Sequence, residues 1–315
     1  MLWEENPLVK GKRHNNVIFI LLCFLIIAAS AAAYGGAEIY NYLNKFSSGS
    51  DVLKPDKVKD DNTPVNILLM GVDIGDGSNT SYKNKRTDTL MLINYKYSEK
   101  KVNIISIPRD TLIQVNGKNE KINAANVLGG VPWVVDAAEK LLNVNVNYYG
   151  MINYEGFRSL IDAMGGVDIM IKNNMNYDDD AQNLHIHFKK GETVHLDGEK
   201  AEEFFRWRKN NDGTGLAMGD LDRIENEHLL VSKVFEKITD PSIIPKIPKI
   251  LEILPKYIQT NMDGGDILRY GMSLKNVPAE NFTIKTLKGD LQYIDGVSYF
   301  IYDMSKNKDI AVLLK

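Results

Sequence analysis

The sequence predicts an α/β domain of the α+β-like kind, with a central mixed β-sheet covered by helices on both faces and one transmembrane helix before it. Three observations predict this. Apolar runs of strand length, such as Val65 to Met70, alternate with amphipathic stretches of helix length, such as Tyr154 to Met164. The strands are apolar on both faces, so the sheet requires cover on each side. An almost unbroken apolar run from Val17 to Ala33 precedes them.

The N-terminal apolar run has the length of a membrane anchor. Extended by Tyr34 to Ala37, it can cross a bilayer core of ~30 Å. Lysine and arginine precede this run and Glu38 follows it, so the positive-inside rule keeps the N-terminus cytoplasmic. Ala29 and Ala31 would also fit a signal-peptidase site, but the run exceeds the ~7 to 15 apolar residues of a signal peptide. We therefore expect a cytoplasmic tail at 1–16, a transmembrane signal anchor at 17–37, an extracellular linker at 38–64 and an extracellular catalytic domain at 65–315.

Composition narrows the classes of function. Of the 315 residues 44% are hydrophobic and 25% charged, which are values of a globular chain. The net charge of -3 argues against a nucleic-acid binder driven by bulk electrostatics. The only cysteine, Cys23, lies within the predicted anchor, so the exported part has no disulfide, no catalytic thiolate and no cysteine zinc site.

The first strands predict where a site forms. Val65 to Met70, Thr89 to Tyr97 and Val102 to Ile107 read as three strands separated by polar turns. If they pair in order as a meander, the exit of the first, the entry of the second and the exit of the third meet at one sheet edge. That edge would collect four charged residues: Asp73, Arg86, Asp88 and Arg109.

Two carboxylates and two guanidiniums on one rim suit a metal ion with an anionic ligand. Magnesium takes few carboxylates together with phosphate oxygens. Arginine matches phosphate with paired hydrogen bonds. In the alternative interpretation, Asp73 caps a turn and the other three form surface ion pairs together with Asp110.

The elements that follow are justified by periodicity and by breaker residues. Asn116 to Glu120 is a polar turn, and Gly165-Gly166 closes the amphipathic helix that begins at Tyr154. Asp220 is a suitable N-cap for a long helix to Ile238. The other expected helices are 121–128, 132–142, 198–207, short ones within 243–259, and 264–274. The other expected strands are 146–152, 167–171 and 281–287, and the segments 185–188 and 192–196 are expected to be short strands or extended loops.

A second basic segment lies later in the chain. Arg206 and Arg208 adjoin a loop of glycine and asparagine, and Arg223 falls in the first turn of a predicted helix, where anions are favoured. Residues two apart on a helix point away from each other, so Arg206 and Arg208 share a face only if the helix ends near Phe205. The alternative is a solvated basic face beside Lys209.

Other motifs are weaker. His185 and His187 have the spacing of two ligands on one strand face, but zinc needs further partners and only His195 could supply one. The run 178–180 of three aspartates lacks the alternating spacing of a calcium loop, so solvated charge is favoured. The glycines after Met70 form no phosphate-binding or dinucleotide fingerprint.

Seven sequence blocks, in this order behind one predicted anchor, resemble the LytR-CpsA-Psr family. They are NILLMGVD, RTDTLML, ISIPRDT, KINAA, INYEGFRSLIDAMGGVDI, HLDGEKAEEFFRWRK and DLDRIENEH. The resemblance covers essentially all of Val65 to Phe235, and the joint occurrence of the blocks is highly specific. It implies a single catalytic domain of that family's type.

The resemblance also implies an activity. Such proteins are extracellular phosphotransferases that move a glycopolymer, for example teichoic acid or capsule, from a polyprenyl pyrophosphate carrier to peptidoglycan, forming a phosphodiester. Magnesium is the implied metal ion, with manganese as the other candidate. By motif, the metal-binding carboxylates are Asp73 and Asp88. The implied pyrophosphate clamp is Arg86, Arg109, Arg206, Arg208 and Arg223. The implied walls of a tunnel for the lipid chain are Leu160, Met164, Val231 and Phe235.

The chain departs from the family pattern at two places. The loop after Asp73 is longer than usual, and Asp76 could compete for the metal. After Arg223 the family commonly has two glutamines, whereas Glu227 and His228 follow here, and Glu227 could pair with Arg223 one helical turn away.

The expected mechanism is phosphoryl transfer with neutralised phosphate charge and an in-line nucleophile. A muramic acid hydroxyl would attack the phosphorus attached to the sugar and release polyprenyl phosphate. Asp73 and Asp88 would bind the metal, or one of them would take the hydroxyl proton, and we expect Arg109 to stabilise developing charge. The rivals are a pyrophosphate hydrolase and a non-catalytic module that binds the lipid carrier or the wall.

Overall fold

The computed structural model describes residues 52–58, 60–72, 82, 85–215, 226, 229–230, 233–234, 237, 240–274 and 277–315. The predicted tail, anchor and first part of the linker therefore lie outside the described residues. Within those ranges, no helix is both long and apolar enough to cross a membrane.

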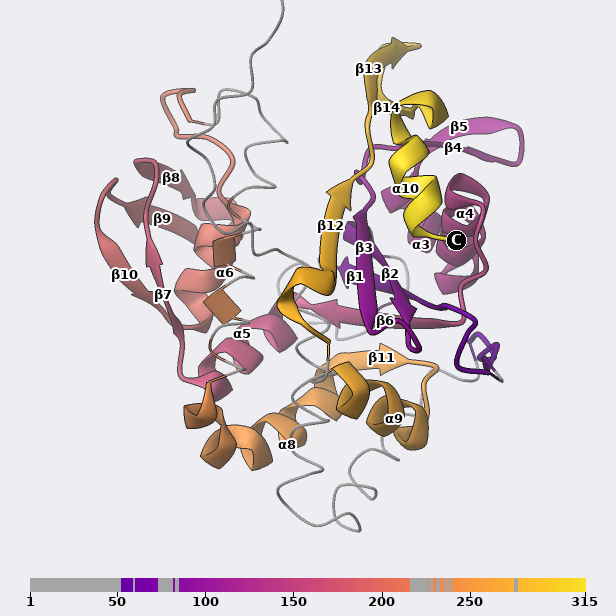
Figure 1. Cartoon of the computed structure of the whole chain (residues 1–315). Helices are drawn as coiled ribbons and strands as arrows, with labels where there is room; N and C mark the ends of the chain where they lie inside the picture. The colour runs from indigo at the N-terminus through magenta and orange to yellow at the C-terminus, as the bar shows by residue number, and fades with distance from the viewer. Residues whose placement is uncertain are drawn as a thin grey trace, which may run out of the picture.

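A six-stranded mixed sheet forms the centre of the molecule, in the order β11-β6-β1-β2-β3-β12 (Figure 1). β1, β2 and β3 pair antiparallel in chain order, which confirms the predicted meander. β6 runs parallel to β1, and β12 runs parallel to β3. The bounds of the six strands are β1 Val65–Val72, β2 Thr87–Lys96, β3 Lys101–Ser106, β6 Tyr148–Asn153, β11 Ile258–Thr260 and β12 Phe282–Thr286.

The register brings three strand ends to one edge of this sheet. Val72 at the end of β1 pairs with Thr87 at the start of β2, and Met91 pairs with Ser106 at the end of β3. The exits of β1 and β3 and the entry of β2 thus lie together. This geometry is the one that the meander predicts.

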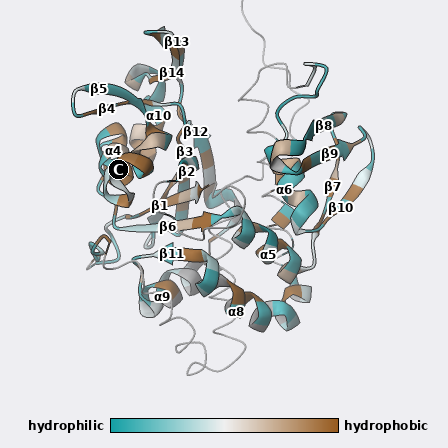
Figure 2. Cartoon of the chain, turned by 180° about the vertical axis from the view of Figure 1, so that it is seen from behind, coloured by the Kyte–Doolittle hydropathy of each residue, from teal (hydrophilic) through white to brown (hydrophobic). Residues whose placement is uncertain are grey.

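Helices cover the sheet on both faces, as the fold class predicts. Alternate residues of β1 separate into two buried clusters: Leu68 and Met70 pack with α4, while Ile67 and Leu69 pack with α5. Figure 2 shows hydrophobic and hydrophilic residues alternating along the flanking helices. One face carries α3 Ala125–Gly129, α4 Val131–Leu142 and α10 Lys308–Leu313, and the other carries α5 Tyr154–Met164, α8 Ile247–Tyr257 and α9 Gly264–Leu274.

Four two-stranded sheets lie around the central sheet and its helices. The antiparallel pairs are β4 Leu112–Val115 with β5 Lys118–Lys121, β7 Val167–Met170 with β10 Thr193–Leu196, β8 Met175–Asp179 with β9 Leu184–Phe188, and β13 Gly289–Ile294 with β14 Val297–Tyr302. The remaining elements are α6 Gly198–Arg206 and the 3₁₀ turns η2 Ile122–Ala124, η3 Asp180–Gln182, η4 Pro241–Lys246, η5 Ala279–Asn281 and η6 Met304–Asn307.

The polar turn predicted at 116–120 is wrong at its end, because residues 118–120 belong to strand β5. Only Asn116 and Gly117 form the turn, with φ angles of 50° and 75°. Positive φ at both central residues is the type I′ geometry, which matches the twist of the flanking strands. The predicted long helix from Asp220 lies mostly outside the described residues, and Asn226, Leu230 and Val234 within it are helical.

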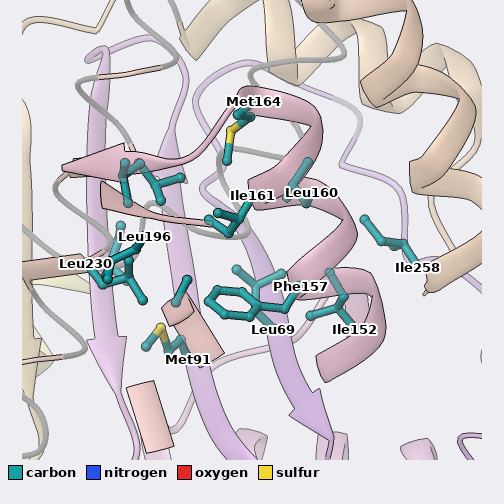
Figure 3. Close-up of a cluster of buried hydrophobic side chains, with 14 of the residues drawn as sticks. Leu69, Met91, Ile152, Phe157, Leu160, Ile161, Met164, Leu196, Leu230 and Ile258 are labelled. Carbon is teal, nitrogen blue, oxygen red and sulfur yellow. The ribbon is translucent and has the colours of Figure 1, made fainter. Parts of the chain in front are cut away.

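The face covered by α5 holds the larger buried cluster (Figure 3). Phe157, Leu160, Ile161 and Met164 lie at the spacing of one helix face and pack toward β1, including Leu69. The helix begins at Asn153, whose side chain accepts a hydrogen bond from the N–H of Gly156, and it ends at Gly165 in the left-handed conformation. The sequence prediction of this helix is confirmed at both ends.

A ladder of buried asparagines crosses the other end of the sheet. The Asn94 amide donates to Asn66 Oδ1 at 2.9 Å, and the Asn103 amide donates to Asn94 Oδ1 at 3.1 Å. Asn103 also donates to the carbonyl of Leu313 at 3.0 Å, and Asn94 to that of Leu314 at 3.4 Å. The ladder thus satisfies carbonyls at the end of α10 and ties the C-terminus to the sheet.

Candidate functional site

An open pocket of about 980 Å³ lies at the sheet edge where β1, β2 and β3 converge. It brings together four residues that the sequence places in the site: Arg86, Asp88, Arg109 and Arg208. The other lining residues are Lys85, Asp110, Asn119, Glu120, Lys121, Asn123, Ala124, Val297 and Tyr299. Segments far apart in the chain therefore meet here, as the meander and the second basic segment predict.

Asp88 and Arg109 form an ion pair inside this pocket. Oδ1 of Asp88 lies 2.9 Å from Nη1 of Arg109, and their side chains are 23% and 19% exposed. The turn after β3 holds Arg109 in place, because the N–H of Thr111 donates to the carbonyl of Pro108 at 3.0 Å, and the N–H of Asn123 donates to the carbonyl of Arg109 at 3.1 Å. A partly buried charge pair is screened less than a surface one, so both charges act strongly on a ligand.

Arg86 and Arg208 complete the cationic side and are both exposed to solvent. Arg86 immediately precedes β2. Arg208 follows the end of α6 at Arg206, where Trp207 takes an extended conformation and is fully buried. The Trp207 indole N–H donates to Asn210 Oδ1 at 3.1 Å, which anchors the segment that carries Arg208.

Arg206 lies in a different environment from Arg208. It is the last residue of α6, one position before the predicted helix end at residue 207, and its Nη1 donates to Glu202 Oε1 at 3.0 Å. Its guanidinium lies 5.4 Å from the ring centroid of Tyr154, a cation–π arrangement. Glu202 also accepts from Arg158 Nη1 at 2.6 Å. Sequence reasoning missed Glu202, although its i,i+4 spacing to Arg206 was a signal for the pair.

Asp110 pairs with Lys121 at 2.9 Å, on the side of the pocket formed by the β4–β5 hairpin. From the sequence, Asp110 is expected only as part of surface ion pairs. Both this pair and the Asp88–Arg109 pair exist, but they line a concave pocket with lysine and arginine neighbours. An ion-pair role and a ligand-binding role are therefore compatible here.

Several predicted residues lie outside the described residues: Asp73, Asp76, Arg223, Glu227, His228, Val231 and Phe235. Their roles stay predictions. Leu160 and Met164, the other predicted tunnel walls, are fully buried on α5 in the cluster of Figure 3. Their contact with a lipid chain also stays a prediction.

Of the two predicted metal-binding carboxylates, Asp88 lies within the described residues and offers one oxygen for a metal ion. Oδ1 of Asp88 pairs with Arg109, and within the described part of the chain Oδ2 of Asp88 has no hydrogen-bond or ion-pair partner. Magnesium binds through one or two carboxylates and keeps several waters, so Asp88 fits half of the predicted pair with Asp73. Among the described residues, no group of three or more metal-binding side chains occurs.

The histidines form pairs with aspartates on exposed hairpins. His185 Nδ1 lies 2.8 Å from Asp178 Oδ1, and His187 Nε2 lies 3.1 Å from the same oxygen. His195 instead lies 2.7 Å from Asp168. Asp178, at one end of the aspartate run, belongs to strand β8, and its exposed side chain pairs with histidines of β9.

A family model, named relatives and solved structures all indicate the same family. The sequence model of the LytR_cpsA_psr family matches residues 35–315. A Bacillus mycoides protein named polyisoprenyl-teichoic acid–peptidoglycan teichoic acid transferase TagU is 31% identical over 94% of this chain and 96% of its own. A Streptococcus agalactiae crystal structure matches with a TM-score of 0.69 and 28% identity, over 82% of this chain and 90% of that one. The crystal structure of B. subtilis TagV matches with a TM-score of 0.64 and 26% identity, over 80% and 96% of the two chains. The chain belongs to the LytR-CpsA-Psr family.

Proposed function

We propose that this protein transfers a phosphoglycan, such as teichoic acid or a capsule polymer, from a polyprenyl pyrophosphate carrier to peptidoglycan. One observation carries the proposal: Arg86, Arg109 and Arg208 line one pocket together with Asp88. The names of the TagU relatives support it, because those proteins are described as transferring teichoic acid from a polyisoprenyl carrier to peptidoglycan.

The pocket suits a pyrophosphate better than a neutral ligand. Its cationic side carries four positive side chains and one carboxylate, from Lys85, Arg86, Arg109, Arg208 and Asp88. Guanidinium groups hold phosphate oxygens through paired, charge-assisted hydrogen bonds. In phosphoryl transfer most of the barrier is lowered by positioning and by neutralising charge on these oxygens.

The transfer step exchanges one phosphorus–oxygen bond for another. A hydroxyl of the peptidoglycan acceptor attacks the phosphorus attached to the glycan, and the bond from that phosphorus to the bridging oxygen breaks. Polyprenyl phosphate leaves, and a phosphodiester remains between glycan and acceptor. Arg109, held by Asp88, carries its charge to the oxygens on which negative charge develops. Where it does not bind the metal ion, Asp88 is a pocket carboxylate able to accept the hydroxyl proton.

We also propose magnesium, or manganese in its place, as the metal ion of the site. Asp88 and Asp73 would hold it, with phosphate oxygens and waters as further ligands. When bound, it supplies positive charge that neutralises the pyrophosphate. The Asp88 Oδ2 that is left over from the pair with Arg109 supports this assignment.

The proposed location is the outer face of the cell membrane. The apolar run at 17–37 would anchor the chain in a single pass, with a cytoplasmic N-terminus and an extracellular catalytic domain. A membrane-bound enzyme can reach a lipid-linked donor in the same bilayer.

The test is a product analysis with the full chain in detergent micelles. A synthetic polyprenyl pyrophosphate glycan and peptidoglycan oligomers are incubated with magnesium or with chelator, and the products are identified by mass spectrometry. A metal-dependent phosphodiester adduct that disappears in Asp88→Ala is the expected result. Free phosphoglycan without adduct would identify a hydrolase, and bound but unchanged lipid would identify a carrier module.

A further inference from the structure

The active-site pocket has two walls of different chemistry. The wall already described is strongly cationic. The second wall carries two carboxylates, one ammonium, two amides, a tyrosine and a valine: Asp110, Glu120, Lys121, Asn119, Asn123, Tyr299 and Val297. A wall with more carboxylates than cations repels a pyrophosphate, so the two walls do not bind the same part of a substrate.

The second wall is assembled from three segments that are fixed to one another. The β4–β5 hairpin contributes Asn119, the β13–β14 hairpin contributes Tyr299, and the Tyr299 hydroxyl donates to the carbonyl of Asn119 at 3.3 Å. The N–H of Phe300 donates to the carbonyl of Asp110 at 2.9 Å. Tyr299 is only 7% exposed, so the wall is held in place before any ligand arrives.

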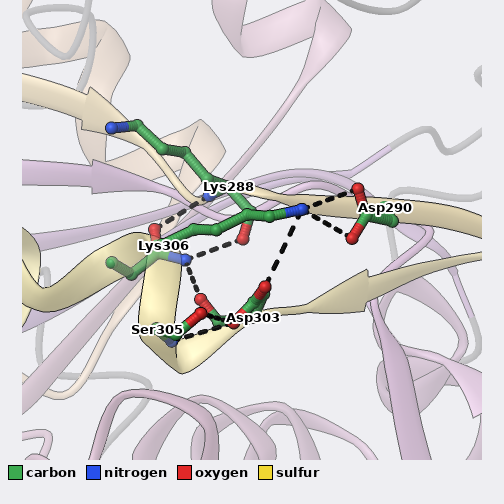
Figure 4. A network of polar contacts seen from close by, with 6 residues as sticks. Lys288, Asp290, Asp303, Ser305 and Lys306 are labelled. Atoms are coloured by element: carbon green, nitrogen blue, oxygen red, sulfur yellow. Dashed lines mark hydrogen bonds and ion pairs between the residues drawn. The ribbon is translucent and has the colours of Figure 1, made fainter.

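The base of the β13–β14 hairpin is also fixed (Figure 4). Lys306 Nζ lies 2.6 Å from Asp290 Oδ2 and 3.7 Å from Asp303 Oδ2, which joins the first strand of the hairpin to the turn after its second strand. Asp303 in turn accepts from the N–H of Ser305 at 2.8 Å. The hairpin therefore forms a positioned wall of the pocket.

Asn123 gives the second wall a group suited to a ligand. It lines the pocket and is 6% exposed, and within the described part of the chain its side-chain amide has no hydrogen-bond partner. An amide on a pocket wall whose hydrogen-bonding groups are not used by the described residues is available to bind a ligand or water. An amide both donates and accepts, as a sugar hydroxyl does.

The second wall is joined directly to the catalytic one. Asp110 follows Arg109 in the chain, and the N–H of Asn123 donates to the carbonyl of Arg109 at 3.1 Å. A sugar held by Asn123 and Asp110 would thus present a hydroxyl beside the phosphorus that Arg109 binds. Paired charges, amides and one tyrosine beside a valine suit a polyhydroxylated ligand, because they offer hydrogen bonds together with an apolar surface.

We propose that this second wall is the acceptor subsite and binds the glycan strand of peptidoglycan. The inference rests on the proposed function, since it assigns the acceptor of the same transfer. It predicts that changes on this wall weaken acceptor binding and leave donor binding intact.

Two variants test the subsite from different sides. Asn123→Ala removes the amide, and Val297→Trp fills the pocket from a position that is 43% exposed, where the fold tolerates a larger side chain. The matched control is Leu291→Trp on the same hairpin. Leu291 pairs with Phe300, so it lies on the face of the hairpin opposite to Val297 and Tyr299, and it is 72% exposed.

Three quantities are measured on the full chain in detergent micelles. They are the Kd for the lipid-linked donor, the Kd for soluble peptidoglycan fragments, and the KM for those fragments in the transfer reaction. We expect Asn123→Ala to raise the fragment Kd and KM by about tenfold, the size of one lost hydrogen-bonded contact, and Val297→Trp to raise both by about tenfold or more because the indole occupies the pocket. The donor Kd should stay within twofold of wild type in both variants. Leu291→Trp should match wild type in all three.

The direct binding measurement separates this inference from the proposed function. If wild type binds fragments but forms no adduct, the transferase proposal fails, and loss of fragment binding in Val297→Trp still supports the subsite. Unchanged fragment Kd in both variants, or no saturable fragment binding by wild type, would overturn the subsite. A raised donor Kd with unchanged fragment Kd would overturn it too, by assigning the wall to the donor glycan.

Discussion

Asp88 Oδ1 lies 2.9 Å from Arg109 Nη1, and this contact joins the start of strand β2 to the turn that follows β3. The carboxylate thereby fixes the guanidinium that points into the pocket. Arg109→Ala should lower turnover by about 10²-fold, because a preorganised charge at the transferring phosphate is removed. Steady-state transfer kinetics at saturating donor measure this effect.

The control for Arg109→Ala is Arg269→Ala on α9. Arg269 also pairs with an aspartate, Asp61, but it is not in the pocket and its side chain is 42% exposed. Its removal changes the net charge equally and should leave turnover within twofold of wild type. Near-normal transfer by a folded Arg109→Ala protein would remove this arginine from the mechanism.

Arg206 and Arg208 should differ in what they contribute. Arg208 lines the pocket, whereas Arg206 lies against Glu202 and Tyr154. Arg208→Ala should therefore weaken donor binding by about 10- to 100-fold, the equivalent of one charge-assisted hydrogen bond worth about 1.5–3 kcal/mol. Arg206→Ala should weaken it less and instead lower the free energy of unfolding by about 1 kcal/mol.

Donor titration and urea unfolding on both variants separate these two effects. Wild type and Glu202→Gln are the references, since Glu202→Gln keeps the shape of the partner of Arg206 and removes its charge. An equal loss of donor affinity in Arg206→Ala and Arg208→Ala would mean that Arg206 also belongs to the pyrophosphate clamp, as the family resemblance implies.

The meander and the site edge were predictable from the sequence because strand order follows chain order there. Once β1, β2 and β3 pair in sequence, the ends of the apolar runs decide which charges meet, and Asp88 and Arg109 follow directly. The helix at Tyr154–Met164 was predictable for the same kind of local reason, since an N-cap, an apolar face and two glycines bound it.

The other wall of the pocket was not predictable, because it depends on long-range packing. Tyr299 reaches Asn119 across 180 positions, and no local pattern near either residue indicates that contact. The Asn116-Gly117 turn was a missed local signal, since this dipeptide strongly predicts a two-residue hairpin. This dipeptide therefore also predicts strand β5 and its place beside the site edge.

The asparagine ladder should stabilise the fold without affecting the reaction. Asn94→Ala leaves Asn66 Oδ1 without the donor at 2.9 Å and removes the acceptor of Asn103. We expect the free energy of unfolding to fall by about 1–3 kcal/mol, the cost of buried polar groups that lose partners. Urea denaturation of the purified protein gives this number.

Turnover of folded Asn94→Ala should equal that of wild type. Asn66 lies six residues before the end of β1, roughly 20 Å along the strand from the site edge. The control is Asn145→Ala, whose exposed amide donates to Asp56 and should change stability by less than about 0.5 kcal/mol. A loss of turnover in Asn94→Ala at full folding would show that the ladder also positions the site.

Glu203 on α6 should make folding stability depend on pH. Burial, together with the charges of Glu199 and Asp197, raises the pKa of Glu203 from 4.5 to about 7. The folded state thus binds a proton more tightly than the unfolded chain. The contribution of this proton binding to the free energy of unfolding is complete below about pH 4.5 and is lost as the pH rises through about 7. Glu203→Gln should therefore stabilise the protein at pH 8 relative to wild type, with little effect at pH 4.5.

The measurement is the urea midpoint of wild type and Glu203→Gln between pH 4.5 and 8. His185 adds a trend of the same sign, because its hydrogen bond to Asp178 raises its pKa above 6.5, so only the difference between the two proteins reports Glu203. Glu252→Gln removes the same charge from an exposed position on α8 and should give a curve parallel to wild type. Parallel curves for Glu203→Gln would mean that Glu203 is ionised throughout this range, and that solvent reaches it more freely than its place on α6 implies.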